Sequence, residues 1–99
     1  MAHVAVQRRA TADLAGIARD LAHHAGRSVA DDYRLRFKAA LGRLSAFPEI
    51  AALRPALGQG VRVMTVKPYV ILHRYDPARD TVFVLRVLHG RRRLALDAP

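Results

Sequence analysis

The residues of this chain that could carry chemistry are mostly cations and imidazoles in its last third. Metal-free cleavage of RNA needs a base for the 2′-hydroxyl proton, cations that stabilise the phosphorane, and an acid for the leaving 5′-oxygen. His89 could transfer protons, and Arg62 or Arg86 could hold the phosphate. A histidine at a strand end is, however, more often a surface residue. The full candidate set is Arg62, His73, Arg74, Arg86, His89, Arg91, Arg92 and Arg93.

Other kinds of active site find little support. The chain has no cysteine, which excludes a thiol nucleophile, a disulfide and a zinc–thiolate site. His23 and His24 are adjacent and point to different sides of a helix, so we expect no metal and no other cofactor. Asp31 and Asp32 fall in the first turn of an expected helix, where they favour its dipole. Gly58-Gln59-Gly60 lacks the ending of a phosphate-binding loop.

Length and charge narrow the class of protein further. The chain has 99 residues, and 17 Lys plus Arg against 8 Asp plus Glu give a net charge of +9. We therefore expect one domain over residues 1–99, whose charge favours a polyanion or an acidic protein as partner. No apolar run approaches the ~18–20 residues that cross a bilayer, and no signal peptide is evident, which predicts a cytoplasmic protein without a membrane partner.

The first half of the chain reads as a short strand and two helices. Residues 3–6 alternate weakly and predict a short N-terminal strand. Apolar residues then recur at helical spacing from Thr11, a potential N-cap, to Gly26, which supplies the helix stop. Ser28 and Asp31 resemble a capping box that opens a second helix, and Pro48 ends it. Two helices separated by two residues form an antiparallel hairpin.

The second half alternates with period two. Residues 48–60 read as a loop, and residues 61–66, 69–75 and 81–88 as three antiparallel strands. The fold class is therefore α+β: a short N-terminal strand and a helical hairpin packed on an antiparallel sheet of three to four strands.

Strand pairing assigns the side chains to faces of this sheet. A two-residue turn at Lys67-Pro68 places Val66 opposite Tyr69, and Arg62 opposite His73. A five-residue loop at 76–80 then places His73 opposite Phe83. We expect the helices to cover the face of Tyr69, His73, Phe83, Leu85 and Val87. The other face would carry Val82, Val84, Arg74 and Arg86, either as an apolar surface that a protein partner covers or with both arginines snorkelling at an edge.

The last third of the chain resembles a known family. The segments are Gly60-Val-Arg62, Tyr69-Val-Ile-Leu-His-Arg74-Tyr75 and Val82-Phe-Val-Leu-Arg86-Val-Leu-His89-Gly-Arg91-Arg92. They resemble the ParE/RelE superfamily of toxins from bacterial type II toxin–antitoxin systems, and the segment from Leu85 to Arg92 resembles the ParE branch. With the preceding strand and helices, the resemblance spans nearly the whole chain.

The resemblance implies a small toxin that a cognate ParD-like antitoxin neutralises by covering its apolar grooves. ParE-like members are associated with poisoning DNA gyrase by binding, whereas RelE-like members cleave mRNA on the ribosome. The residues that match the family pattern, and that would contact target or antitoxin, are Arg62, Tyr69, Arg74, Arg86, His89, Arg91 and Arg92. Tyr69 would mainly fix the sheet by packing.

Two departures argue against the RelE activity. RelE-like nucleases typically carry Arg after the strand tyrosine, where this chain has Val70, and a tyrosine in the C-terminal tail, where residues 94–99 hold no aromatic residue. We therefore predict a gyrase-binding toxin without enzymatic activity. The alternatives are a ribosome-dependent endoribonuclease that uses Arg62, Arg86 and His89, and a basic nucleic-acid-binding module.

Overall fold

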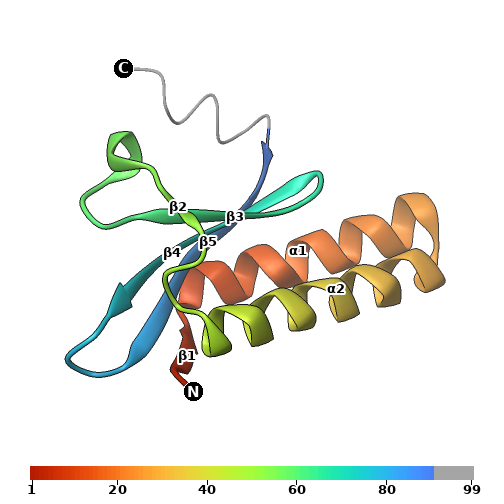
Figure 1. Ribbon diagram of the computed structural model, residues 1–99. Helices are drawn as coiled ribbons and strands as arrows, with labels where there is room; N and C mark the ends of the chain where they lie inside the picture. The colour runs from red at the N-terminus through yellow and green to blue at the C-terminus, as the bar shows by residue number, and fades with distance from the viewer. Residues whose placement is uncertain (91–99) are drawn as a thin grey trace.

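The computed structural model describes residues 1–90 as two helices and a five-stranded sheet (Figure 1). The sheet order is β1-β5-β4-β3-β2. The elements are β1 (His3–Val6), α1 (Arg8–Ala25), α2 (Arg27–Ala46), β2 (Ala52–Leu53), the 3-10 helix η1 (Pro55–Leu57), β3 (Arg62–Val66), β4 (Tyr69–Asp76) and β5 (Thr81–His89).

The two helices form the expected hairpin and lie side by side on one face of the sheet (Figure 1). α1 begins at Arg8, before the expected cap at Thr11, because Gln7 is already extended and its carbonyl accepts a hydrogen bond from Thr11 N–H. Gly26 alone separates the helices, with φ of +99°, a value that glycine adopts without a steric cost. α2 therefore begins at Arg27, and Ser28 makes no capping hydrogen bond.

The sheet is mixed and has five strands, which corrects the expected antiparallel sheet of three to four strands. β1 pairs in parallel with β5, so the N-terminal strand lies beside the last described strand. The second addition is β2, which pairs antiparallel with β3 inside the segment that was expected to be a loop. Ala52 and Leu53 are too few to leave a periodic signal in the sequence.

The β3–β4 register is the expected one, with Val66 opposite Tyr69 and Arg62 opposite His73. The expected β4–β5 register is wrong. Asp76 pairs with Thr81, so the turn is one residue shorter, and a β-bulge follows at Leu72 and His73. His73 consequently lies opposite Val84 instead of Phe83.

This register changes the face assignment along β5. Val82 and Val84 pack into the helix-side core, and Phe83 alternates with them toward the opposite face. The predicted faces of Val82, Phe83 and Val84 are therefore wrong, because the shorter turn shifts their pairing by one residue.

The bulge then leaves Leu85 without a partner on β4. Beyond the bulge the expected faces return, because Arg86 lies opposite Leu72 and two residues before Leu88, which both pack on the face away from the helices. The prediction for the face of Arg86 is therefore correct, and its guanidinium reaches Asp13 of α1 from there.

Two apolar clusters hold the layers together. The larger lies between the helices and the sheet, and includes Phe37 and Leu44 of α2 with Ile71 and Val84 of the sheet. The smaller lies on the other face, where Leu57 of η1 packs against the sheet residues Val61, Val70, Leu72 and Leu88. The 54–60 segment thus supplies part of the cover that the second face was expected to need. Within residues 1–90, no helix has the length and apolar character needed to cross a membrane.

Candidate functional site

Tyr69, at the start of β4, is the centre of an aromatic cluster. Its ring centroid lies 5.6 Å from those of Tyr33 and Phe37 on α2, and 5.8 Å from that of His89 at the end of β5. Burial raises the pKa of Tyr69, and the nearby Tyr33 and Asp20 add to this effect. The hydroxyl therefore stays protonated, and the ring acts as packing that ties the sheet to α2.

Arg62, a candidate phosphate ligand, is bound by the segment that leads from α2 to β2. Its Nη1 donates to the carbonyl oxygens of Glu49 and Ala51 at 3.0 and 2.8 Å. Its Nη2 lies 3.4 Å from the Glu49 carboxylate. With a side chain only 17% exposed, the guanidinium braces this segment against β3.

Arg86, the second candidate phosphate ligand, is held by Asp13 of α1. Its Nε and Nη2 donate to the two carboxylate oxygens at 2.8 and 3.0 Å, which is the bidentate geometry of a strong ion pair. The backbone N–H of Val87 donates to the same carboxylate at 2.9 Å. Burial acts to raise the pKa of Asp13, but the hydrogen bonds from Arg86 and Val87 outweigh it and lower the pKa below its usual value. The pair therefore fastens α1 to β5.

The remaining candidates occupy different surroundings. Arg74 is exposed and donates through Nε to the Gln59 carbonyl at 2.8 Å. His89 is exposed, with its ring against Tyr69. Arg91 and Arg92 lie outside the described residues. The structure thus brings Tyr69 and His89 together, whereas Arg62 and Arg86 are bound by separate partners.

His73, at the β-bulge, is completely buried. Its Nδ1 lies 3.1 Å from the Ile71 carbonyl, and its Nε2 has no hydrogen-bond partner among the described residues. Burial lowers the pKa of His73; the Ile71 hydrogen bond opposes this shift and the nearby Arg62 charge reinforces it. The ring is therefore neutral near pH 7 and belongs to the core instead of to an accessible catalytic surface.

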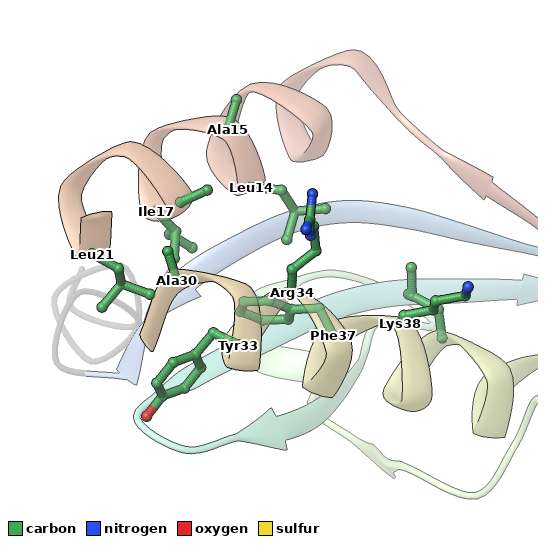
Figure 2. Close-up of a pocket in the computed structure, with 11 residues that line it drawn as sticks. Leu14, Ala15, Ile17, Leu21, Ala30, Tyr33, Arg34, Phe37 and Lys38 are labelled. Carbon is green, nitrogen blue, oxygen red and sulfur yellow. The ribbon is translucent and has the colours of Figure 1, made fainter. Parts of the chain in front are cut away.

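An apolar groove of about 430 Å³ lies between the two helices. Figure 2 shows Leu14, Ile17 and Leu21 of α1 facing α2 across this groove. Phe37 lies on the α2 side, and the long side chains of Arg34 and Lys38 border the groove (Figure 2). This groove, defined by these residues and called the hairpin groove below, presents an apolar floor beside positive charge.

A second hollow, of about 340 Å³, lies between α1 and the adjoining ends of β4 and β5. Asp13, Gly16 and Asp20 line it from α1, and Tyr69 and His89 line it from the sheet. Its lining combines carboxylates with aromatic and apolar side chains, whereas the lining of the hairpin groove is mainly apolar. Among residues 1–90, no three His, Cys, Asp or Glu side chains gather as metal ligands.

Asp13 is the important residue that the sequence reasoning missed. It lies three residues after the buried Ala10 and four before Ile17, which places it on the buried face of α1. A carboxylate on such a face needs a cationic or N–H partner, and an arginine within a strand needs an anionic one. A buried-face aspartate and a strand arginine in one sequence therefore indicate an ion pair, although the sequence does not reveal which two residues form it.

The comparisons with known proteins agree with this architecture. Residues 4–94 match the family model of the ParE toxin of the type II toxin–antitoxin system parDE. Toxin ParE3 of Caulobacter vibrioides is 36% identical over 95 residues, which cover 96% of this chain and 93% of that protein.

Solved structures show the same fold. A chain of the chromosomal ParDE toxin–antitoxin system from P. aeruginosa superposes with a TM-score of 0.76 at 23% identity, covering 90% of this chain and 96% of the other. A chain of the RelBE2 toxin–antitoxin complex from Mycobacterium tuberculosis gives 0.61 at 27% identity, covering 89% and 96%. Because the family model and the sequence relative both span nearly the whole chain, this protein belongs to the ParE toxin family, within the ParE/RelE superfamily of type II toxin–antitoxin systems.

Proposed function

We propose that this ParE-family protein is a toxin that acts by binding its target, DNA gyrase, and not by cleaving RNA. The observation that carries the proposal is the bidentate pair between Arg86 and Asp13. A guanidinium whose Nε and Nη2 both engage a carboxylate is already neutralised and is poorly placed to stabilise a phosphorane.

Arg62 adds to this argument, because its guanidinium is used by the Glu49 and Ala51 carbonyls. A nuclease built on Arg62, Arg86 and His89 would have to break both sets of contacts before it could bind a phosphate. Of these three residues, only His89 is exposed. A binding mechanism uses the surface as it stands and requires no such rearrangement.

The hairpin groove supports a cognate antitoxin as the second partner. An apolar floor bordered by Arg34 and Lys38 suits a segment with one apolar face and acidic residues along its side. The similar chain from M. tuberculosis was solved in a toxin–antitoxin complex. We propose that an antitoxin segment fills this groove and that toxin and antitoxin meet in the cytoplasm.

The test of the target is expression from a tightly controlled promoter in a bacterial host. Plasmid supercoiling and total mRNA are followed in the same culture. We expect supercoiling to fall, or DNA to be cleaved, while mRNA stays intact. Cuts at codon positions in mRNA with normal supercoiling would contradict the proposal and support the nuclease alternative. In the second arm, purified toxin should inhibit gyrase directly.

The antitoxin groove is tested with two glutamate substitutions on α1. Ala18 lines the groove, whereas Ala22 lies on the same helix, is exposed and does not line it. Ala18→Glu should weaken binding of the co-expressed antitoxin at least tenfold, and Ala22→Glu should leave it unchanged. Circular dichroism checks that both variants fold. Equal binding by both variants would place the antitoxin elsewhere.

A further inference from the structure

A third hollow, lined by cations, lies where α2 passes the open edge of β3. Its volume is about 290 Å³. The α2 side supplies Arg36, Ala39 and Arg43, and the strand side supplies Thr65, Val66 and Lys67. We call this hollow the edge cleft. It is separate from the hairpin groove and from the hollow beside Tyr69, with which it shares no lining residue.

The edge cleft is open because β2 is so short. β2 pairs only with Arg62 and Val63, so the rest of β3 has no strand on its outer side. Antiparallel pairing alternates the direction of backbone groups. Arg54 N–H donates to the Val61 carbonyl across the β2–β3 pair, and Val63 pairs with Ala52. Two residues further on, the N–H of Thr65 therefore also points outward, toward the cleft.

The charges that line the edge cleft are all positive. Among residues 1–90, the Arg43 guanidinium has only a long contact to a neutral atom, 4.0 Å from its Nη2 to the Met64 sulfur. Arg36 pairs with Asp32 at 2.9 Å, but both side chains are more than half exposed, so water screens this pair and a stronger anion can compete for Arg36. Lys67 and Thr65 are exposed. Within the described part of the chain, the lining thus contains three cations, one hydroxyl and no carboxylate.

We propose that the edge cleft binds a phosphodiester group of a nucleic-acid backbone. Two guanidinium groups, an ammonium, a hydroxyl and an outward N–H are the donors that phosphate oxygens accept from. Ala39 leaves space between Arg36 and Arg43, which lie seven residues apart on one side of α2. The net charge of +9 draws a polyanion toward the surface, whereas a free phosphate would gain less from that long-range field.

This site differs in kind from the candidates of the sequence analysis. Arg62 and Arg86 lie within the sheet and are bound by the chain's own acceptors, whereas Arg43 and Lys67 border open space. The edge cleft gives the toxin a contact to DNA or RNA that does not depend on gyrase being the target. Binding to nucleic acid and loss of supercoiling can therefore fail independently.

The test measures binding of the full chain to a short fluorescent DNA duplex by anisotropy, over salt concentrations from about 50 to 200 mM. The test variant is Arg43→Gln with Lys67→Gln. The matched control is Arg8→Gln with Arg19→Gln, which removes two exposed cations of α1 and gives the same net charge. Ala39→Glu is a third variant, which keeps every cation and places a carboxylate in the cleft.

We expect the test variant and Ala39→Glu to lose about tenfold in affinity, and the control to lose at most about twofold. The slope of log affinity against log salt should fall by about 1.8 in the test variant, since each phosphate contact contributes about 0.9.

Equal losses of affinity in the test and control variants would show that the duplex is attracted by the overall charge, and would contradict a specific site in the edge cleft. Displacement of the duplex by millimolar inorganic phosphate would indicate a small phosphate ligand, and equally tight binding of polyglutamate would indicate an acidic protein. Either of these results would also overturn the proposal. Thermal unfolding of each variant confirms that it is folded.

Discussion

The arginines of the sheet and the cations at the β3 edge contrast sharply, although the sequence presents them as one basic class. Arg86 is bound by Asp13, and Arg62 by the Glu49 and Ala51 region, with side chains 25% and 17% exposed. Arg43 and Lys67 are exposed and border a hollow that no carboxylate of residues 1–90 lines. The first pair stabilises the fold, and the second remains available to a partner. The net charge of a chain therefore overstates the charge that it can offer to a ligand.

The contrast predicts where substitutions will cost stability, and the largest loss is expected at Arg86. Arg86→Met leaves the Asp13 carboxylate largely buried with only the Val87 N–H as a partner. We expect the free energy of unfolding to fall by about 3 kcal/mol, the lower end of what breaking a buried pair costs, because this pair is partly exposed. Urea denaturation measures the loss. Adding Asp13→Asn should recover part of it, and no recovery would mean that the charge pair is not the cause.

A smaller loss is expected at Arg62, which donates to two carbonyls rather than to a buried carboxylate. Arg62→Met should lower the free energy of unfolding by about 1–3 kcal/mol, because two acceptors lose a charged donor. Arg74 offers a control on the neighbouring strand, since it donates to one carbonyl and is exposed. Arg74→Met should cost clearly less in the same urea experiment. If both variants lost the same free energy of unfolding, Arg62 would stabilise the fold no more than the exposed Arg74 does.

His73 sharpens the comparison, because it is the buried counterpart of the exposed His89. Its pKa is lowered in the folded protein, mainly by burial, while the unfolded chain binds a proton near the usual pKa of about 6.5. Stability is therefore fully present above about pH 6.5 and falls by about 1.4 kcal/mol per pH unit below it, until the folded-state pKa is reached. Urea denaturation at several pH values measures this slope. His73→Leu should remove it, and persistence of the slope in that variant would assign it to another group.

The smallest effect on stability is expected at the edge cleft. Arg43→Gln with Lys67→Gln removes two exposed side chains, so the melting temperature should change by no more than ~2 °C. Differential scanning calorimetry measures this shift. A large decrease in melting temperature would mean that Arg43 and Lys67 stabilise the fold as Arg62 and Arg86 do, and would contradict the contrast between the two groups.

The local features of the fold could be predicted from the sequence. The helix stop at Gly26, the end of α2 before Pro48 and the β3–β4 register at Lys67-Pro68 all depend on residues close together in the chain. The β4–β5 register failed for a physical reason. A bulge at Leu72 and His73 and a shorter turn each move the pairing by one residue, and neither has a distinct residue signature here.

The candidate site was harder to predict than the fold. Family resemblance pointed to Arg62 and Arg86, but their availability depends on which groups fold against them. Asp13 and Arg86 are 73 residues apart, and no pattern within one element couples them. The edge cleft likewise depends on the shortness of β2, which leaves the outer side of β3 uncovered. Residues that meet only through tertiary structure carry no local signal.

The parallel pairing of β1 with β5 has a consequence for how the toxin appears in a cell. His3 lies beside Thr81, so the strand that pairs with β1 is synthesised 78 residues later in the chain. β5 also carries Arg86 and is the strand against which α1 is fastened. Contacts this far apart in sequence form late, after most of the chain-closure entropy has been lost. The five-stranded sheet therefore cannot be completed before β5 has been synthesised, and the fastening of α1 through Arg86 has to wait for the same strand.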